Sequence, residues 1–167
     1  YLQWDGVSDK TFTLLRGAPY LSEKERAARN CIEAGLSVLF VATVARGVND
    51  GELGDLLRAA LAFGPQVRGL HLQPVASFGR YPWKNPNEAR LTLPDLMHAL
   101  KKQSEGLVKA TDFHPPGSEH ALCSFSALYQ RLECGGLDLV SSEHGCCGTP
   151  ASSTRPEEYR ARDFVAQ

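Results

Sequence analysis

The sequence lacks several features that would assign it to a common class of protein. No apolar run approaches the roughly 18–20 residues that a membrane-spanning helix needs. Neither charge is in excess, because 18 lysines and arginines oppose 19 aspartates and glutamates. This balance argues against a basic nucleic-acid surface and against a polybasic membrane anchor. Internal repeats and low-complexity segments are also missing, so the sequence does not indicate a repeat protein or a disordered chain.

The chain has 167 residues, of which 43% are hydrophobic and 22% are charged. This length is sufficient for one domain with a core of its own, and it is too short for two ordinary domains. The first residue is Tyr1 rather than Met, and an apolar strand pattern begins there at once. We therefore expect an N-terminal portion to precede this sequence in the whole protein.

Cysteine is scarce and irregularly spaced. The five cysteines include no Cys-x-x-Cys pair, and this odd number predicts reduced thiols and a cytoplasmic protein rather than a disulfide framework. Cys31 falls within a helical pattern, which favours a place in the core. The other four crowd into the last third of the chain near His120 and His144, where they are either metal ligands or ordinary thiols. These four candidates are Cys123, Cys134, Cys146 and Cys147.

The first two thirds of the sequence alternate between strand and helix patterns. Strands are predicted over residues 1–4, 36–44 and 67–73, and the continuous Val-rich run at 36–44 is typical of a strand buried on both faces. Capping-box patterns at Ser22 and Asn49 predict the starts of two helices, and Thr92 opens another. The order β-α-β-α-β-loop-α predicts an α/β fold with a parallel sheet and right-handed connections.

The pattern breaks at about Asp112. Proline and glycine pairs interrupt the remaining sequence, in which residues 137–140 resemble a short strand and residues 156–165 a terminal helix. We therefore predict two parts. Residues 1–111 form the α/β part, and residues 112–167 form an irregular extension that contains most of the cysteines.

Polar residues gather where the predicted strands end, which is where parallel α/β sheets place their binding sites. Gln3 and Asp5 share one face of the first strand, and His71 and Gln73 share the face of the third strand that points away from the helices. Buried polar groups need hydrogen-bond partners, so this convergence predicts a polar ligand at the strand ends. The candidate residues are Gln3, Asp5, Arg46, Asn49, His71 and Gln73, with Arg80 beyond Pro74.

Each candidate also has a structural interpretation. Asn49 fits a helix cap, and Asp5 followed by glycine fits a turn. Arg46 fits an ion pair with Asp5, and His71 fits a hydrogen-bonded interior residue. The convergence of three strands on one edge favours a site more than any single residue does.

Several segments together resemble the core of radical S-adenosylmethionine enzymes. Residues 1–6 (YLQWDG) followed by 15–17 (LRG) are similar to the middle of that core, and 46–50 (RGVND) followed by Glu52 is similar to the fifth-strand segment of the molybdenum-cofactor biosynthesis enzyme and its relatives. Residues 72–75, 79–80, 91–95 and 112–115 are similar to the branch that contains tetraether lipid synthase and related pterin methylases. The resemblance covers about residues 1–125.

This resemblance implies a partial six-unit (β/α) barrel, of which the chain would supply strands four to six. Strands one to three would lie upstream of Tyr1. The family's Cys-x-x-x-Cys-x-x-Cys motif, which holds a 4Fe–4S cluster, does not occur in the sequence. The implied cofactors, S-adenosylmethionine and the 4Fe–4S cluster, therefore belong to the intact enzyme, and this chain alone is not expected to cleave S-adenosylmethionine.

The resemblance also implies roles for the strand-end residues. Gln3 stands where relatives place a polar residue near the cofactor ribose, and Arg46 with the backbone of residues 47–49 lies where the fifth strand approaches the cofactor. The segment Gln73-Pro74 would flank the adenine. Asp5, His71 and Gln73 would orient cofactor or substrate.

The implied reaction is radical chemistry at an unactivated carbon, as methylation or carbon–carbon bond formation on a small-molecule or lipid substrate. Two other hypotheses remain. The chain is a catalytically inert half-barrel that associates through its open sheet edge, with the missing half or with a second copy. Alternatively, it is a small metal-binding module that uses its cysteines and histidines.

Overall fold

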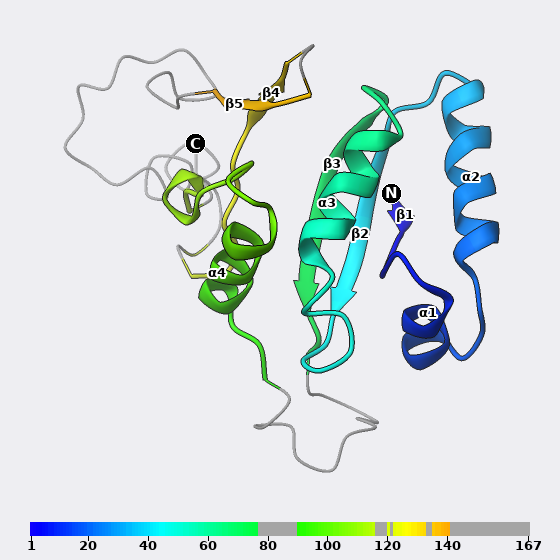
Figure 1. Ribbon diagram of the computed structural model, residues 1–167, viewed down its shortest axis with the longest axis horizontal. Helices are drawn as coiled ribbons and strands as arrows, with labels where there is room; N and C mark the ends of the chain where they lie inside the picture. The colour runs from blue at the N-terminus through cyan, green and yellow to red at the C-terminus, as the bar shows by residue number, and fades with distance from the viewer. Residues whose placement is uncertain (77–89, 116–119, 121, 133–134, 141–167) are drawn as a thin grey trace, which may run out of the picture. The chain divides into compact units, whose positions relative to one another are not determined.

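The computed structural model describes residues 1–76, 90–115, 120, 122–132 and 135–140 (Figure 1). The chain divides into two compact units, Tyr1–Gly106 and Leu107–Gln167. The division predicted between residues 111 and 112 remains a prediction. Within the described residues, no helix combines the length and hydrophobicity required to cross a bilayer.

The first unit is mixed α/β, as predicted. Its elements are β1 (Leu2–Gln3), α1 (Asp9–Arg16), α2 (Leu21–Glu33), β2 (Val38–Val44), α3 (Leu53–Ala62), β3 (Val67–Pro74) and α4 (Leu93–Gln103). The strands form one parallel sheet in the order β1-β2-β3. Figure 1 shows α1 beyond the arrowhead ends of β2 and β3, which places it at the carboxyl edge of the sheet.

An aromatic cluster on one face of the sheet forms the centre of the core. Trp4 stacks on Phe40 with their ring centroids 4.5 Å apart, and Phe63, at the end of α3, meets both rings edge-on. Such aromatic contacts add to the free energy gained by burying large apolar surfaces. The cluster therefore attaches the end of α3 to the first two strands.

The two faces of β2 differ, so the prediction of a strand buried on both faces is wrong for the described residues. Val38, Phe40, Ala42 and Val44 are buried, whereas the alternate residues between them are only half-buried. Among the described residues, α2 and α3 pack against the sheet on the first face. In register, Phe40 lies beside Leu70 and Val41 beside His71, which agrees with the prediction that the leucines of β3 face the helices.

Two of the predicted helix caps are wrong. The α2 helix begins at Leu21 without a side-chain cap, and the Ser22 hydroxyl donates to Glu23 instead. The α3 helix begins after Glu52, also without a side-chain cap. The capping box at Thr92 is present at the start of α4, where Thr92 and Asp95 bond each other's backbone N–H.

The second unit holds a 3₁₀ turn (Ala110–Asp112) and the antiparallel strands β4 (Tyr129–Arg131) and β5 (Leu137–Leu139). The Tyr129 hydroxyl donates to the Asp112 carboxylate over 2.6 Å. The strand predicted at 137–140 is thus confirmed, whereas the predicted terminal helix lies outside the described residues.

A glycine permits the close approach of α3 to α4. A Cβ built on Gly54 would overlap the carbonyl oxygen of Gln103 and lie 2.7 Å from its carbonyl carbon. The Gly54 N–H donates to the Gln103 side chain over 3.2 Å. Any larger residue at this position would push the two helices apart.

We expect Gly54→Ala to lower the free energy of unfolding by about 1–3 kcal/mol, because overpacking outweighs the gain in helix propensity. The matched control is Gly51→Ala, since a Cβ there meets nothing within 4 Å. Urea unfolding of both variants measures the difference. Equal stabilities would show that the α3–α4 contact is not this close.

Candidate functional site

A buried carboxylate collects hydrogen bonds from three segments at the carboxyl edge of the sheet. Asp5 is fully buried just after β1. Its carboxylate accepts from Arg16 Nε (2.7 Å) and Arg16 Nη2 (3.0 Å) at the end of α1. It also accepts from Gln3 Nε2 at 2.6 Å and from the Thr43 backbone N–H at 2.9 Å. Asp5 therefore joins β1, β2 and α1, and the simple turn considered for Asp5 does not describe its role.

Local signals in the sequence position Arg16. Ser8 caps the start of α1 by accepting from the Thr11 N–H, and Gly17 ends the helix in the left-handed region at φ 84°. The Thr11 hydroxyl donates to Glu52 over 2.7 Å, which holds the helix against the start of α3. Arg16 is the last residue of α1, so its guanidinium reaches back to the strand ends.

Hydrogen bonds keep Asp5 ionised. Burial alone raises the pKa of this carboxyl, but the bonds from Arg16, the Thr43 N–H and Gln3 outweigh burial and hold the pKa below its ordinary value of 3.8. The same contact with Asp5 raises the pKa of Arg16. At neutral pH the two groups form an ion pair. The Arg16 side chain in this pair remains 36% exposed to solvent.

Asn49 is a positioning residue in the fold rather than a helix cap. Its side chain is fully buried. Its oxygen accepts from the Ala45 N–H (2.8 Å), and its nitrogen donates to the carbonyl oxygens of Asp5 (2.6 Å) and Thr43 (2.8 Å). Asn49 therefore holds the ends of β1 and β2 together.

Arg46 does not pair with Asp5, so that interpretation is wrong. Its guanidinium instead bonds the Asp95 carboxylate at 3.2 Å and the carbonyl oxygen of Arg90 at 3.0 Å. Arg16 takes the position beside Asp5 because α1 ends there. Nothing in the sequence around Arg46 indicates that Arg16, rather than Arg46, pairs with Asp5.

His71 and Gln73 lie exposed on the face of β3 that the helices leave open. In register, Val41 separates Gln3 from His71, and Gln73 lies beside Thr43. Neither side chain has a hydrogen-bond partner in the described part of the chain, and Pro74 ends the strand next to Val44. We call the polar groups on this face and edge the strand-end surface, which consists of Gln3, Asp5, Arg16, Thr43, His71 and Gln73.

The structure describes only one of the four cysteines that were predicted as candidate metal ligands. Cys123 is exposed and carries a free thiol. Cys134, Cys146, Cys147 and Arg80 lie outside the described residues. The described ranges contain no group of three His, Cys, Asp or Glu side chains that could hold a metal ion. Cys31 is half-buried on α2 rather than in the core.

The strand-end surface offers hydrogen bonds to a polar ligand. Arg16 Nη1 makes no hydrogen bond to the described residues, and the side chains of His71 and Gln73 are available as donors or acceptors. A ligand at this edge would therefore meet one oriented cation and two polar side chains that have no partner among the described residues.

Comparison with known proteins points to one relative. The chain is 37% identical over 150 residues to a protein of Methanocaldococcus jannaschii named 7,8-dihydro-6-hydroxymethylpterin dimethyltransferase. The match covers 89% of this chain and 29% of the relative, so the chain spans less than a third of that protein's length. No protein-family model matches the sequence.

We expect Asp5→Asn to lower the free energy of unfolding by about 2 kcal/mol at neutral pH, since it leaves Arg16 without its buried partner. This figure is below that of a fully buried pair because Arg16 is partly exposed to solvent. The control is Asp138→Asn, a change at an exposed strand position. Loss of stability in both variants alike would contradict a special role for Asp5.

The stability difference between the parent and Asp5→Asn should depend on pH in a direction that follows from the pKa of Asp5. Because the pKa of Asp5 is lower in the folded than in the unfolded protein, its ionisation stabilises the fold above the ordinary value of 3.8. The stability gap between parent and Asp5→Asn should stay constant from neutral pH down to about pH 5 and shrink below about pH 4. Thermal unfolding across this range measures the gap. A gap that widens on acidification would contradict the assignment.

Proposed function

We propose that this chain forms the second half of the barrel of a radical S-adenosylmethionine methyltransferase that acts on a small ring-bearing substrate. The observation that carries the proposal is the strand-end surface, where the buried Asp5 carboxylate, its partly exposed partner Arg16 and free polar side chains meet at the carboxyl edge of a parallel sheet. Ligands of α/β proteins bind at this edge. The name of the relative, a pterin dimethyltransferase, supports the choice of methyl transfer.

The sheet is consistent with strands four to six of a partial barrel. Helices cover one face, and the other carries the polar side chains that a barrel would enclose. In the order β1-β2-β3, the outer edge of β1 has no partner strand among the described residues. An unpaired strand edge favours association, and we propose that a strand from the rest of the protein, or from a second copy, pairs with it.

The residues present fit S-adenosylmethionine. Arg16 Nη1 offers N–H donors for the carboxylate of the methionine end, and Gln3 and Thr43 offer groups for the ribose hydroxyls. Gln73 and Pro74 offer an amide and an apolar surface for the adenine. When bound, S-adenosylmethionine would supply the methyl group and the radical of this enzyme family, while the chain binds and orients it.

The residues present do not fit a 4Fe–4S cluster. The three-cysteine motif of the family does not occur in the sequence, and no metal-binding group occurs in the described ranges. We therefore derive no step through a cluster from this chain. In the proposed enzyme its ligands come from outside this sequence.

A chimera tests the proposal. This chain replaces the matching segment of the Methanocaldococcus jannaschii relative, and the purified chimera is assayed anaerobically for methylation of 7,8-dihydro-6-hydroxymethylpterin. We expect methylated product, because a segment from the same enzyme class would rebuild the barrel. A chimera that folds as the parent does, and makes no product under conditions in which the parent makes it, would contradict the proposal.

Variants of the chimera locate the site. We expect Arg16→Lys to reduce kcat/KM by about tenfold or more, since lysine cannot reproduce the bidentate pair with Asp5. The matched control is Arg131→Lys, an exposed arginine on β4, which should leave kcat/KM unchanged. Equal effects of the two substitutions would exclude the strand-end surface as the site.

A further inference from the structure

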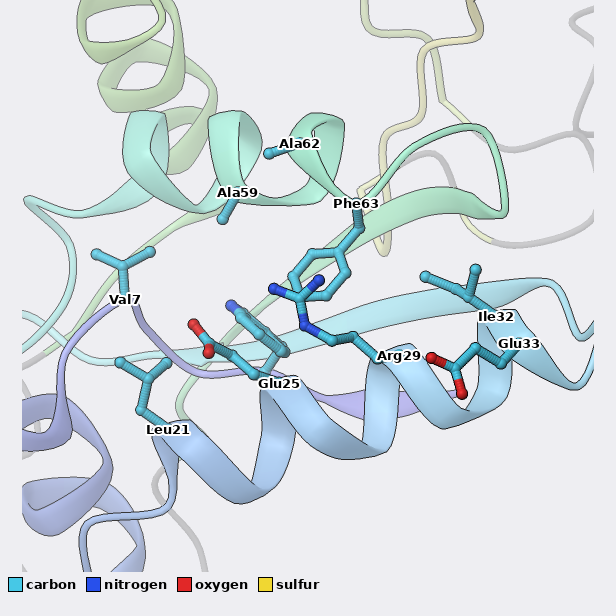
Figure 2. Close-up of a pocket in the computed structure, with 10 residues that line it drawn as sticks. Val7, Leu21, Glu25, Arg29, Ile32, Glu33, Ala59, Ala62 and Phe63 are labelled. Carbon is cyan, nitrogen blue, oxygen red and sulfur yellow. The ribbon is translucent and has the colours of Figure 1, made fainter.

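A pocket of about 430 Å³ lies between α2 and α3 (Figure 2). Because Trp4 in its lining alternates with Gln3 and Asp5 along the extended chain, the pocket lies on the opposite face of the sheet from the strand-end surface. Residues of α2 line one wall and residues of α3 the other, with Trp4 also in the lining. Its volume is within the range of small-molecule sites. The pocket belongs entirely to the first unit and shares no residue with the strand-end surface.

The wall formed by α2 carries charged side chains beside the apolar Leu21 and Ile32. Glu25, Arg29 and Glu33 follow one another at four-residue intervals, which places them on one side of the helix, and all three line the pocket. Opposite them α3 contributes Ala59 and Ala62, whose side chains are too small to fill the space. Helix pairs that only pack against each other bring apolar side chains to this position.

Two polar groups of residues that line the pocket lack a polar partner among the described residues. The indole Nε1 of Trp4 is buried and is a side-chain donor with no hydrogen-bond partner in the described part of the chain. Such a donor is costly when it stays unpaired. The Arg29 guanidinium makes no ion pair within the described residues. It lies instead 5.4 Å from the centroid of the Phe63 ring, and Figure 2 shows the two side chains facing each other.

We propose that this pocket binds an uncharged, planar aromatic compound that carries an amide-like group. Anionic ligands would meet Glu25 and Glu33, and cationic ligands would meet Arg29, so the lining disfavours both. An amide supplies an acceptor for Arg29 and a donor for a glutamate. Its ring contacts Phe63 and the alanines of α3.

Benzamide is the probe, and the 167-residue chain is the sample. The reporter is the indole N–H resonance of Trp4, which the Trp83→Phe variant distinguishes from that of the second tryptophan. We expect benzamide to shift this resonance saturably with millimolar affinity. Benzoate and benzylamine, its charged counterparts, should bind about tenfold or more weakly, a difference of ~1.4 kcal/mol.

Variants that fill the pocket with a larger side chain test whether benzamide binds there. Ala59→Leu and the more exposed Ala62→Leu should each abolish the saturable shift, whereas Ala76→Leu, at an exposed position after β3, should not. Circular dichroism confirms that the variants used are folded. Arg16→Lys should leave benzamide binding unchanged, because the strand-end surface lies on the other face. The proposal is overturned by an unsaturable shift, by undiminished binding in a folded filled variant, or by equal binding of the charged probes.

Discussion

The buried carboxylate of Asp5 is the interaction on which the carboxyl edge of the sheet depends. A charged group without solvent costs several kcal/mol unless it is paired and hydrogen-bonded. Asp5 meets this requirement with donors from Gln3, from the Thr43 backbone and from Arg16. Each donor comes from a different element, so satisfying one carboxylate fixes the end of β1 against β2 and the end of α1 against both. Asn49 adds a second tie between the same strands through the Asp5 carbonyl oxygen.

The two faces of the sheet differ in their chemistry. On the helix side, Trp4 and Phe40 stack, and apolar burial provides the stability. On the other side, the half-buried positions of β2 and the exposed His71 and Gln73 leave a surface that the described residues do not cover. Side chains alternate along a strand, so the same residues that build the core on one face position the polar groups on the other. The proposed barrel and the proposed ligand therefore follow from one pattern of alternation.

Sequence reasoning found the elements whose signals are local. The apolar runs predicted β2 and β3, and the pattern that opens at Thr92 predicted the start of α4, because each signal lies within a few residues. The helix α1 was missed because it is short and its apolar residues are few, although Ser8 and Gly17 bracket it with an N-cap and a left-handed C-cap. For the site, Gln3 and Asp5 were found together on one face. Arg46 was considered as a structural partner of Asp5 and Arg16 was not, because the helix that brings Arg16 to the strand ends was itself missed.

Whether Arg16 or Arg46 pairs with Asp5 decides which cation the strand-end surface would present to a ligand. Arg46 is held by an exposed carboxylate and a backbone carbonyl at the start of α4. Arg16 is held by a buried carboxylate and by the Thr43 hydroxyl at 2.9 Å, so its remaining donors on Nη1 are oriented before a ligand arrives. Preorganised groups bind with less loss of side-chain entropy than free ones. We therefore expect Arg16 to contribute most of the affinity for an anionic group. In the proposed complex, His71 and Gln73, which have no hydrogen-bond partner among the described residues, would adapt to the rest of the ligand.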